Sequence, residues 1–389
     1  MKKYFIAFLF LYCTAKLNPV IVILSAIFGG VAVYSNQQTM QLGVLGSGSF
    51  ATALAKLLTD NGNTINWYVR NKQTAEHIIK RHHNPNYLSS VYFDTNTLSL
   101  SDSIEETIKQ SEYIVLAIPS SYIHETLKDL PRNLFNGKKI ISAVKGIMPE
   151  QVLLVNDYLK QEFNVPLENY YCIMGPCHAE EVAAEKLSYL TFSGVDEMHT
   201  QEIAAHFKTV YLNTVINDDV YGVQFAAILK NIYALAAGIA HGLEYGDNFL
   251  SVLIANAADE MAGFLRKVGV RNMEVGIHHN ILPGVQPIIP LKKSANYAAS
   301  VYLGDLLVTC YSLFSRNRTF GNMIGKGYSV KSAQLELNMV AEGYNASRCI
   351  NIINEKEKAE IPIAETVYKI LWETLSPKEG FKQLEETLI

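Results

Sequence analysis

A single lysine stands inside a long apolar segment of this chain. Residues 220–243 are rich in Ala, Leu and Ile, and Lys230 carries their only formal charge. An ammonium in an apolar helix costs free energy unless it is paired, neutralised or open to a cavity. Burial lowers an amine's pKa, so such a lysine can give and take protons near neutral pH. The alternative is a lysine that reaches water along the helix surface, and Asn231 beside it adds a polar donor.

Three small residues form a second pattern between two expected elements. Residues 41–45 have the composition of a short buried strand, and residues 51–58 that of a helix with one apolar face. Gly46 allows a tight turn, Gly48 lets a pyrophosphate approach the backbone, and Ala51 lets the helix pack on the strand. Free N–H groups at the helix start suit phosphate charge. Strand, glycine turn and helix in this order predict a dinucleotide site, although the glycine pattern without this context is usually a plain turn.

The end of the second expected strand bears on which nicotinamide cofactor is used. Residues 64–69 alternate as a strand does and are followed by Arg70. NAD-selective sites usually carry Asp or Glu about 20 residues after the glycines. Arg70 can instead pair with a 2′-phosphate. We therefore expect NADPH to be favoured, with NADH still open, and the plain alternative is an arginine solvated at a strand end.

Residue types that bind phosphate follow in the last third of the chain. Ser315, Arg316 and Asn317 come shortly after residues 304–309, which read Gly-Asp-Leu-Leu-Val-Thr. A guanidinium binds phosphate through a planar fork, and Ser and Asn supply further donors. This set suits a phosphate ester, whereas a solvated basic turn is the alternative for these residues taken alone.

The order of apolar runs predicts the elements that position these groups. Short runs such as 113–118 and 139–144 alternate with helical stretches up to about residue 217. This alternation predicts an α/β fold, with an N-terminal Rossmann-like domain whose sheet is parallel and doubly wound and whose carboxyl edge binds ligands. Long helical patterns then predict an all-α C-terminal domain. We place the dinucleotide-binding domain at 40–218 and the helical, substrate-binding domain at 219–389.

Size and composition bound the classes of protein. With 389 residues and 49% hydrophobic content, the chain can bury the cores of two domains. A net charge of −4 shows no basic excess, so we expect no nucleic acid partner. The five cysteines are odd in number and lack a C-x-x-C spacing, which suits a reducing compartment, and we expect no metal site.

Residues 1–39 differ in composition from the rest. A basic start and an apolar run resemble a signal peptide, and a second apolar run at 19–34 has 16 residues, short of the ~20 that a spanning helix needs. Three interpretations stay open, in this order: translation starts at Met40, the extension anchors the protein to the cytoplasmic face of a membrane, or it is a cleaved signal.

Seven short motifs occur in a fixed order along the chain. They are G-S-G-S-F-A-T-A from Gly46, A-V-K-G from Ala143, G-P-C-H-A-E-E from Gly175, L-K-N from Leu229, G-D-L-L-V-T from Gly304, S-R-N-R from Ser315 and A-E-G from Ala341. From Met40 onward this chain resembles the bacterial-type NAD(P)H-dependent glycerol-3-phosphate dehydrogenases. Seven motifs in the family's order are far more specific than any one of them.

The resemblance implies a role for each matched position. Lys230 falls on the family's catalytic proton acceptor, and Lys145 on a lysine that contacts both substrate and cofactor. With Gly46 and Gly48, the implied cofactor contacts are Ser49, Phe50, Arg70, Lys145, Ala179, Arg316, Val340 and Glu342. The implied substrate contacts are Lys145, Gly175, Cys177, Lys230, Asp305, Ser315, Arg316 and Asn317, with Asn231 and Thr309 as additional polar groups.

Three departures from the family pattern stand out. Phe50 replaces a common Trp, a mild aromatic exchange. Cys177 replaces Ser or Thr, which leaves a weaker donor and an oxidisable thiol at the substrate site. Residues 270–300, with three prolines, look like a loop insertion.

These observations lead to one expected activity. We expect a cytoplasmic enzyme that reduces dihydroxyacetone phosphate to glycerol 3-phosphate, reversibly, and so supplies glycerophospholipid synthesis. Two alternatives are a related two-domain hydroxy-acid dehydrogenase and a non-catalytic, membrane-tethered nucleotide-binding protein. The expected partner is a small-molecule substrate. A membrane is a partner only if residues 1–39 are part of the protein. Whether the protein forms a homodimer is left open.

Overall fold

The computed structural model describes residues 20–24, 31–35, 40–270, 299–337 and 341–389. The chain divides into two compact units, Met1–Met40 and Gln41–Ile389. In the first unit, β1 (Val20–Leu24) and β2 (Val31–Ser35) pair antiparallel, with Val22 opposite Val33. The described parts of the second apolar run are therefore strands.

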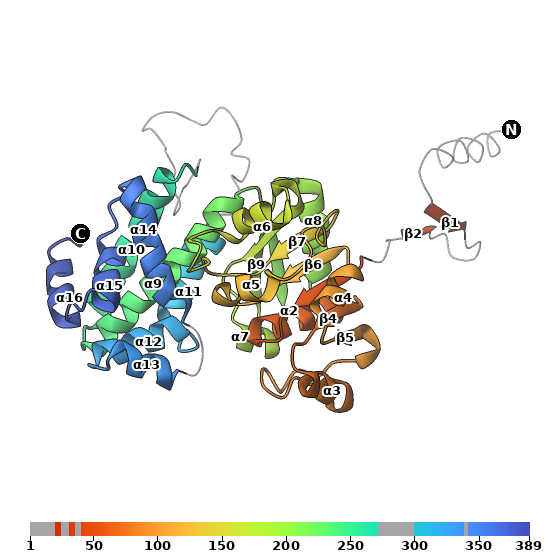
Figure 1. The fold of residues 1–389 in the computed structure, drawn as a ribbon, viewed down its shortest axis with the longest axis horizontal. Coiled ribbons are helices and arrows are strands. Elements are labelled where there is room, and N and C mark those ends of the chain that lie inside the picture. The colour runs from red at the N-terminus through yellow and green to blue at the C-terminus, as the bar shows by residue number, and fades with distance from the viewer. Residues whose placement is uncertain (1–19, 25–30, 36–39, 271–298, 338–340) are drawn as a thin grey trace. The chain divides into compact units, whose positions relative to one another are not determined.

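An eight-stranded sheet opens the second unit, with helices packed along it (Figure 1). Its strand order is β10-β9-β8-β7-β6-β3-β4-β5. The strands are β3 (Leu42–Leu45), β4 (Ile65–Tyr68), β5 (Leu98–Ser101), β6 (Tyr113–Leu116), β7 (Lys139–Ser142), β8 (Tyr170–Met174), β9 (Ser188–Ser193) and β10 (Leu212–Asn217). The predicted Rossmann-like, doubly wound sheet is confirmed. One neighbouring pair, β8 and β9, is antiparallel, so the sheet is mostly rather than wholly parallel.

The first strand of this sheet along the chain is β3, and the chain extends the sheet from it in two directions. It passes first to β4 and β5 on one side, then crosses to β6, β7 and β8 on the other. Such a reversal opens a crevice at the carboxyl ends of the strands. The connecting helices are α2 (Ser49–Asp60), α3 (Lys72–Arg81), α4 (Ile104–Lys109), α5 (Ser120–Leu127), α6 (Val155–Phe163), α7 (Ala179–Ala183) and α8 (Glu197–Phe207), with short turns η1 (Thr95–Thr97) and η2 (Leu167–Asn169).

Helices make up the described part of the chain after β10. They are α9 (Val220–Gly242), α10 (Asp247–Lys267), the π-helical η3 (Ala299–Gly304), α11 (Asp305–Tyr311), α12 (Arg316–Gly325), α13 (Val330–Glu336), α14 (Glu342–Glu357), α15 (Pro362–Trp372) and α16 (Pro377–Glu385). The predicted all-helical C-terminal part is confirmed over these residues.

Helix α9 is the central element of the helical part. It is apolar on nearly all sides, and a helix of this kind packs inside a protein core. Among the described residues it is the one helix long and apolar enough to cross a membrane, yet 94% of its most apolar window is buried in the fold. The Asp219 side chain caps it by accepting a hydrogen bond from the Gly222 N–H, 2.8 Å away. Lys230 therefore projects from a rigid, buried helix.

Close packing of α9 on α12 sets the position of the α12 N-terminus. A Cβ atom at Gly238 would lie 2.1 Å from the Arg318 carbonyl oxygen, and one at Gly321 would lie 2.1 Å from the Leu235 carbonyl oxygen. Such contacts are shorter than van der Waals separation, so the two helices approach this closely only through glycine. This packing brings the start of α12, with Arg316 and Asn317, towards the middle of α9.

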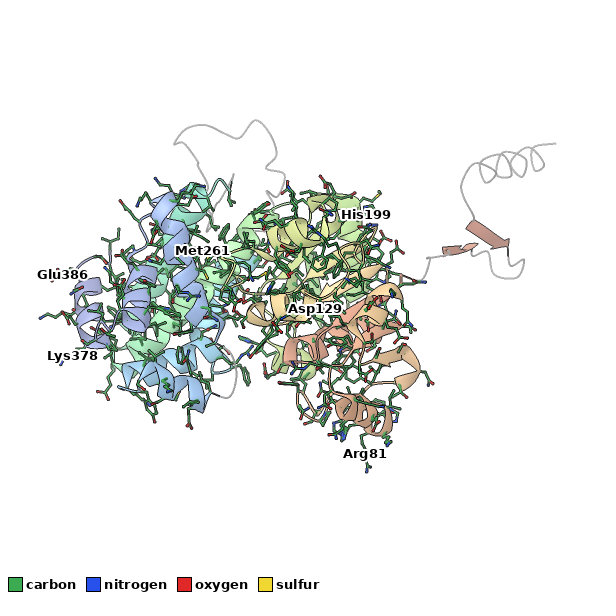
Figure 2. The ribbon with its side chains drawn as sticks, viewed as in Figure 1. Arg81, Asp129, His199, Met261, Lys378 and Glu386 are labelled. Carbon is green, nitrogen blue, oxygen red and sulfur yellow. The ribbon has the colours of Figure 1, made fainter. Side chains whose placement is uncertain are left out.

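The side chains divide into a buried core and an exposed surface (Figure 2). Met261 on α10 is fully buried, whereas Lys378 and Glu386 extend into solvent at α16. The four cysteines in the described part of the chain are buried and unbridged.

Candidate functional site

A cavity of about 390 Å³ lies where the carboxyl ends of the central strands meet the helical part. It is lined by the glycine turn before α2, by the loops after β6, β7 and β8, and by α9, α11, α12 and the start of α14. The sequence predicts that ligands bind at the carboxyl edge of the sheet, and the cavity lies at this edge.

The glycine turn has the geometry that a dinucleotide requires. Gly46 has φ +121°, and a Cβ atom there would lie 2.5 Å from the Ala117 carbonyl oxygen, so glycine is needed. Above Gly48 no atom lies within 4 Å of the Cβ position, which leaves the backbone open to a ligand. Helix α2 begins at Ser49 with no side-chain cap, so its first N–H groups are available to a phosphate.

A buried asparagine supports this turn from behind. The Asn84 side chain is fully buried and donates to the Ser47 carbonyl and to the Thr52 hydroxyl, at 3.0 and 2.9 Å. The Trp67 indole N–H donates to the Gly46 carbonyl at 2.7 Å. These bonds hold the turn in shape before any ligand arrives. Sequence reasoning missed Asn84, because nothing in its local pattern sets it apart from other asparagines.

Lys230 forms a buried ion pair with Asp305. Its Nζ lies 2.5 Å from Asp305 Oδ1 and donates to the Thr309 hydroxyl at 3.2 Å. The two charged residues are 4% and 2% exposed. Burial lowers the pKa of Lys230 to about 8, with Asp305 opposing the shift and Lys145 adding to it. The alternative of a lysine that reaches bulk water is therefore wrong, and the predicted low pKa of a buried lysine agrees with the structure.

Asp305 stays ionised in this setting. Burial alone would raise its pKa, but the neighbouring Lys230 and Lys145 outweigh burial and bring the pKa below its ordinary value. Its second oxygen, Oδ2, lies 4.0 Å from Lys145 Nζ and has no hydrogen-bond partner among the described residues. One carboxylate thus faces two ammonium groups.

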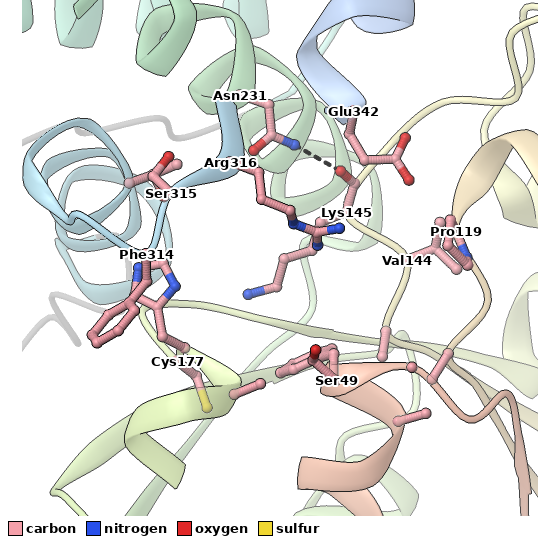
Figure 3. A pocket seen from close by; sticks show the side chains of 18 of the residues that line it. Ser49, Pro119, Val144, Lys145, Cys177, Asn231, Phe314, Ser315, Arg316 and Glu342 are labelled. Carbon is pink, nitrogen blue, oxygen red and sulfur yellow. Dashed lines mark hydrogen bonds between the residues drawn. The ribbon is translucent and has the colours of Figure 1, made fainter. Parts of the chain in front are cut away.

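Lys145 enters the cavity from the loop after β7 (Figure 3). Its Nζ donates to the Gly175 carbonyl at 3.0 Å and lies 4.9 Å from the centre of the Phe50 ring. A cation above an aromatic face is stabilised by the ring quadrupole. Phe50 thus helps to orient Lys145, a function that the exchange of Trp for Phe preserves.

Two asparagines connect the loop of Lys145 to the helical part. Asn231 donates to the Lys145 carbonyl at 2.8 Å, drawn as a dashed line in Figure 3, and its own oxygen accepts from Asn317 at 2.9 Å. Asn317 in turn accepts from the Gly343 N–H at 2.9 Å. Both amides are thus held in place by the protein. They fix the two lysines relative to α12 and α14.

The start of α12 presents the predicted phosphate-binding set. Ser315 is the N-cap residue and accepts from the Arg318 N–H at 3.3 Å. The Arg316 side chain extends from α12 into the cavity towards Lys145 (Figure 3). Arg316 also influences Glu342, whose buried carboxyl accepts from the Ser120 N–H and hydroxyl, at 3.0 and 2.5 Å. Burial raises the pKa of Glu342.

Cys177 lines the cavity beside these charges. Burial raises the pKa of its thiol to about 11, although Lys145 opposes the shift. The thiol is therefore protonated at neutral pH and weakly nucleophilic.

Most of the sequence-predicted site residues line this one cavity. Gly46 and Gly175 do not line it but support it, as the turn residue and as the acceptor for Lys145. Arg70 is exposed after β4 and does not line the cavity, so its proposed contact with a 2′-phosphate stays a prediction. Val340 and nearly all of the expected insertion at 270–300 lie outside the described residues.

Several cavity residues were missed from the sequence. They are mostly apolar or aromatic side chains with no chemical signature of their own: Tyr87, Ala117, Ile118, Pro119, Tyr122, Ala143, Val144, His178, Glu180 and Phe314. Pro119 and Val144 could have been found, because they follow apolar strands at the edge where ligands bind.

Comparison with known proteins places this site in a family. Residues 41–200 match the model of the NAD-dependent glycerol-3-phosphate dehydrogenase N-terminus, and residues 219–382 match that of the C-terminus. This chain belongs to the NAD-dependent glycerol-3-phosphate dehydrogenase family. The resemblance drawn from the seven motifs is therefore confirmed.

Individual relatives agree over most of the chain. A glycerol-3-phosphate dehydrogenase (NAD(P)+) of Clostridium botulinum is 34% identical over 340 residues, which are 87% of this chain and 95% of that protein. One from Oceanobacillus iheyensis is 29% identical over 344 residues, 88% and 93% of the two chains. The crystal structure of glycerol-3-phosphate dehydrogenase from Coxiella burnetii has a TM-score of 0.77 and 25% identity, and the match covers 90% of this chain and 99% of that one.

Proposed function

We propose that the cavity reduces dihydroxyacetone phosphate with Lys230 as proton donor. The reversible reduction of this ketone to glycerol 3-phosphate is the family reaction, and this chain is a glycerol-3-phosphate dehydrogenase by its family membership. The carrying observation is the buried Lys230–Asp305 pair, 2.5 Å apart, in a cavity that also holds Lys145 and Arg316. The residue roles that follow are our proposal.

The protein offers a suitable site for a nicotinamide dinucleotide. The open backbone above Gly48, the uncapped start of α2 and the wall of Ser49 and Phe50 would hold its pyrophosphate end. When bound, the reduced nicotinamide supplies the hydride for the carbonyl carbon. The family uses NAD(P), and we propose NADPH as the preferred form, because Arg70 stands where NAD-selective sites carry an acid.

Arg316 and the α12 N-terminus are suited to the phosphate of the substrate. A guanidinium binds phosphate through two parallel N–H groups, and the first turn of a helix adds its own donors. Ser315 and Asn317 flank Arg316, and both are nearly buried. Fixing the phosphate at this end would place the ketone near the lysines, which makes a bimolecular reaction effectively intramolecular.

Lys230 and Lys145 are arranged to meet the charge that develops on the ketone oxygen. With a pKa of about 8, Lys230 is mostly protonated at pH 7 and can give its proton to that oxygen. Asp305 keeps the ammonium in position and stabilises its charge. In the reverse direction, neutral Lys230 would remove the hydroxyl proton of glycerol 3-phosphate. Lys145, 4.0 Å from Asp305, adds a second positive charge against the developing oxyanion.

We further propose a cytoplasmic enzyme that supplies glycerophospholipid synthesis. NADPH is a cytosolic reagent, and the unbridged cysteines of the described residues suit a reducing compartment. A homodimer and a membrane contact through residues 1–39 stay predictions. Light scattering of the purified protein and fractionation of cells test these two points.

The assay for the proposed function is direct. The purified full chain is mixed with dihydroxyacetone phosphate and either NADPH or NADH, and cofactor oxidation is followed at pH 7. We expect turnover with both, faster at low concentrations of NADPH. Absence of turnover with either cofactor would contradict the proposal, and turnover with a keto acid lacking phosphate would favour the related hydroxy-acid dehydrogenases.

A further inference from the structure

His178 lines the cavity and has no role in the mechanism proposed above. It is the N-cap residue of α7, directly after Cys177, and its side chain makes no capping hydrogen bond. The ring lines the cavity and lies 6.2 Å, centre to centre, from that of Phe314 on the helical side. An imidazole in a substrate cavity that neither caps a helix nor binds a charge is open to a ligand.

The charges around His178 place it at the catalytic end. Besides burial, the largest influences on its pKa are Lys145 and Lys230, which lower it, and Asp305, which raises it. Together they bring the pKa to about 4, so the ring is neutral at physiological pH. These three residues surround the proposed ketone position, whereas Arg316 marks the proposed phosphate position.

The two ring nitrogens have different surroundings. Nε2 is closed to solvent and has no partner of normal hydrogen-bond geometry among the described residues, although the ring interacts with the Val308 backbone. The side chain makes no capping bond, and the residue as a whole is partly exposed. A neutral imidazole carries one proton, and we assign it to the buried Nε2, so that Nδ1 keeps a lone pair.

We propose that His178 Nδ1 accepts a hydrogen bond from the free hydroxyl of the substrate and so determines its specificity. This inference rests on the proposed function. With the phosphate at Arg316 and the ketone at Lys230, the hydroxymethyl group is the remaining end of dihydroxyacetone phosphate. An acceptor suits a hydroxyl, whereas it would repel a phosphate oxygen. A charged imidazole would add a third cation beside the two lysines, so the neutral ring fits this position.

Hydroxyacetone phosphate distinguishes recognition of the free hydroxyl from a general effect of His178 on the site. It has the same ketone and phosphate as dihydroxyacetone phosphate but lacks the hydroxyl. We compare kcat/KM for both substrates, with NADPH, in the full-chain wild type and in His178→Leu, His178→Asn and His178→Gln. The amide of Asn can reach the place of Nδ1, whereas the longer Gln reaches that of Nε2. His241→Leu, an exposed histidine on α9, is the control.

We expect the wild type to prefer dihydroxyacetone phosphate. His178→Leu should lower kcat/KM for this substrate about tenfold, the value of one neutral hydrogen bond, and leave that for hydroxyacetone phosphate within about twofold. His178→Asn should restore most of the preference, and His178→Gln should not. Equal losses on both substrates, no loss, or rescue by Gln alone would overturn the proposal.

Two controls keep the outcomes distinct. Fluorescence titration with NADPH reports whether each variant keeps a folded cofactor site, and if the Leu variant does not, the Asn and Gln variants decide. If the wild type turns over both ketones without preference, the proposed role of His178 is refuted, but the proposed function is not. A wild type that turns over neither refutes the proposed function itself.

Discussion

Replacing Asp305 by Asn should change the acidity of Lys230 and with it the direction of catalysis. The Lys230 Nζ lies 2.5 Å from one carboxylate oxygen, and both side chains are almost fully buried. Because the carboxylate charge is shared by two oxygens, the mean charge separation is roughly 3.5 Å. At an effective dielectric constant of about 20, this separation corresponds to about 5 kcal/mol. Since one pKa unit is 1.36 kcal/mol, loss of the charge should lower the pKa of Lys230 by roughly three to four units.

The sign of the effect follows from the direction of proton transfer. Reduction of the ketone needs protonated Lys230, so the wild-type rate should fall as pH rises through about 8. In Asp305→Asn this limb should move to roughly pH 4 to 5, leaving on the order of 0.1 to 1% of the lysine protonated at pH 7. We therefore expect kcat for reduction at pH 7 to fall by about 100- to 1,000-fold, and oxidation of glycerol 3-phosphate to extend to lower pH.

The assay is a pair of pH–rate profiles with saturating cofactor, one in each direction. Asp247→Asn, an exposed acid at the start of α10, is the control and should match the wild type. If Asp305→Asn lowers the rate but leaves the limb near pH 8, the carboxylate does not hold the charge on Lys230, and the electrostatic reasoning fails.

Three further changes probe the phosphate end, the cofactor end and the start of the chain. Arg316→Ala should raise KM for dihydroxyacetone phosphate about ten- to 150-fold, from the loss of one charged hydrogen bond, and a change in cofactor affinity alone would assign the residue to the nucleotide. Arg70→Asp should shift preference from NADPH to NADH, because a carboxylate repels a 2′-phosphate; an unchanged ratio of kcat/KM values would remove Arg70 from that pocket. Protein starting at Met40 should keep full activity, since the first sheet strand, Leu42–Leu45, follows at once; loss of activity, or a membrane-bound native peptide from residues 17–38 found by mass spectrometry, would contradict this expectation.

Local patterns were enough to predict the elements that hold the site. Strand β3, the glycine turn and α2 form from neighbouring residues, so the sequence 41–58 predicts the strand to within one residue and the helix to within two residues at each end. The charge of Lys230 within an apolar helix likewise predicts its burial. Contacts between segments that are far apart in the sequence could not be predicted from local patterns. The antiparallel β9 depends on how residues 175–187 return to the sheet, which no local pattern reports.

The side-chain contacts within the site could not be predicted from local sequence patterns either. The ion pair of Lys230 and Asp305 joins α9 to α11, 75 positions apart, and was not predicted; the family resemblance implied only that both residues contact the substrate. The hydrogen bonds of Asn84 and the position of the His178 ring in the cavity depend on exact side-chain placement. For this reason neither could be predicted from residue type and spacing.

The most direct test of the central claim replaces Lys230 by Met, which keeps the apolar stem and removes the ammonium. The measurement is kcat for NADPH oxidation by dihydroxyacetone phosphate at pH 7, beside NADPH affinity by fluorescence titration. Lys267→Met, an exposed lysine at the end of α10, is the control. We predict a loss of about 100- to 10,000-fold in kcat for Lys230→Met, with cofactor affinity retained and the control unchanged. A rate within tenfold of the wild type would show that Lys230 does not supply the proton.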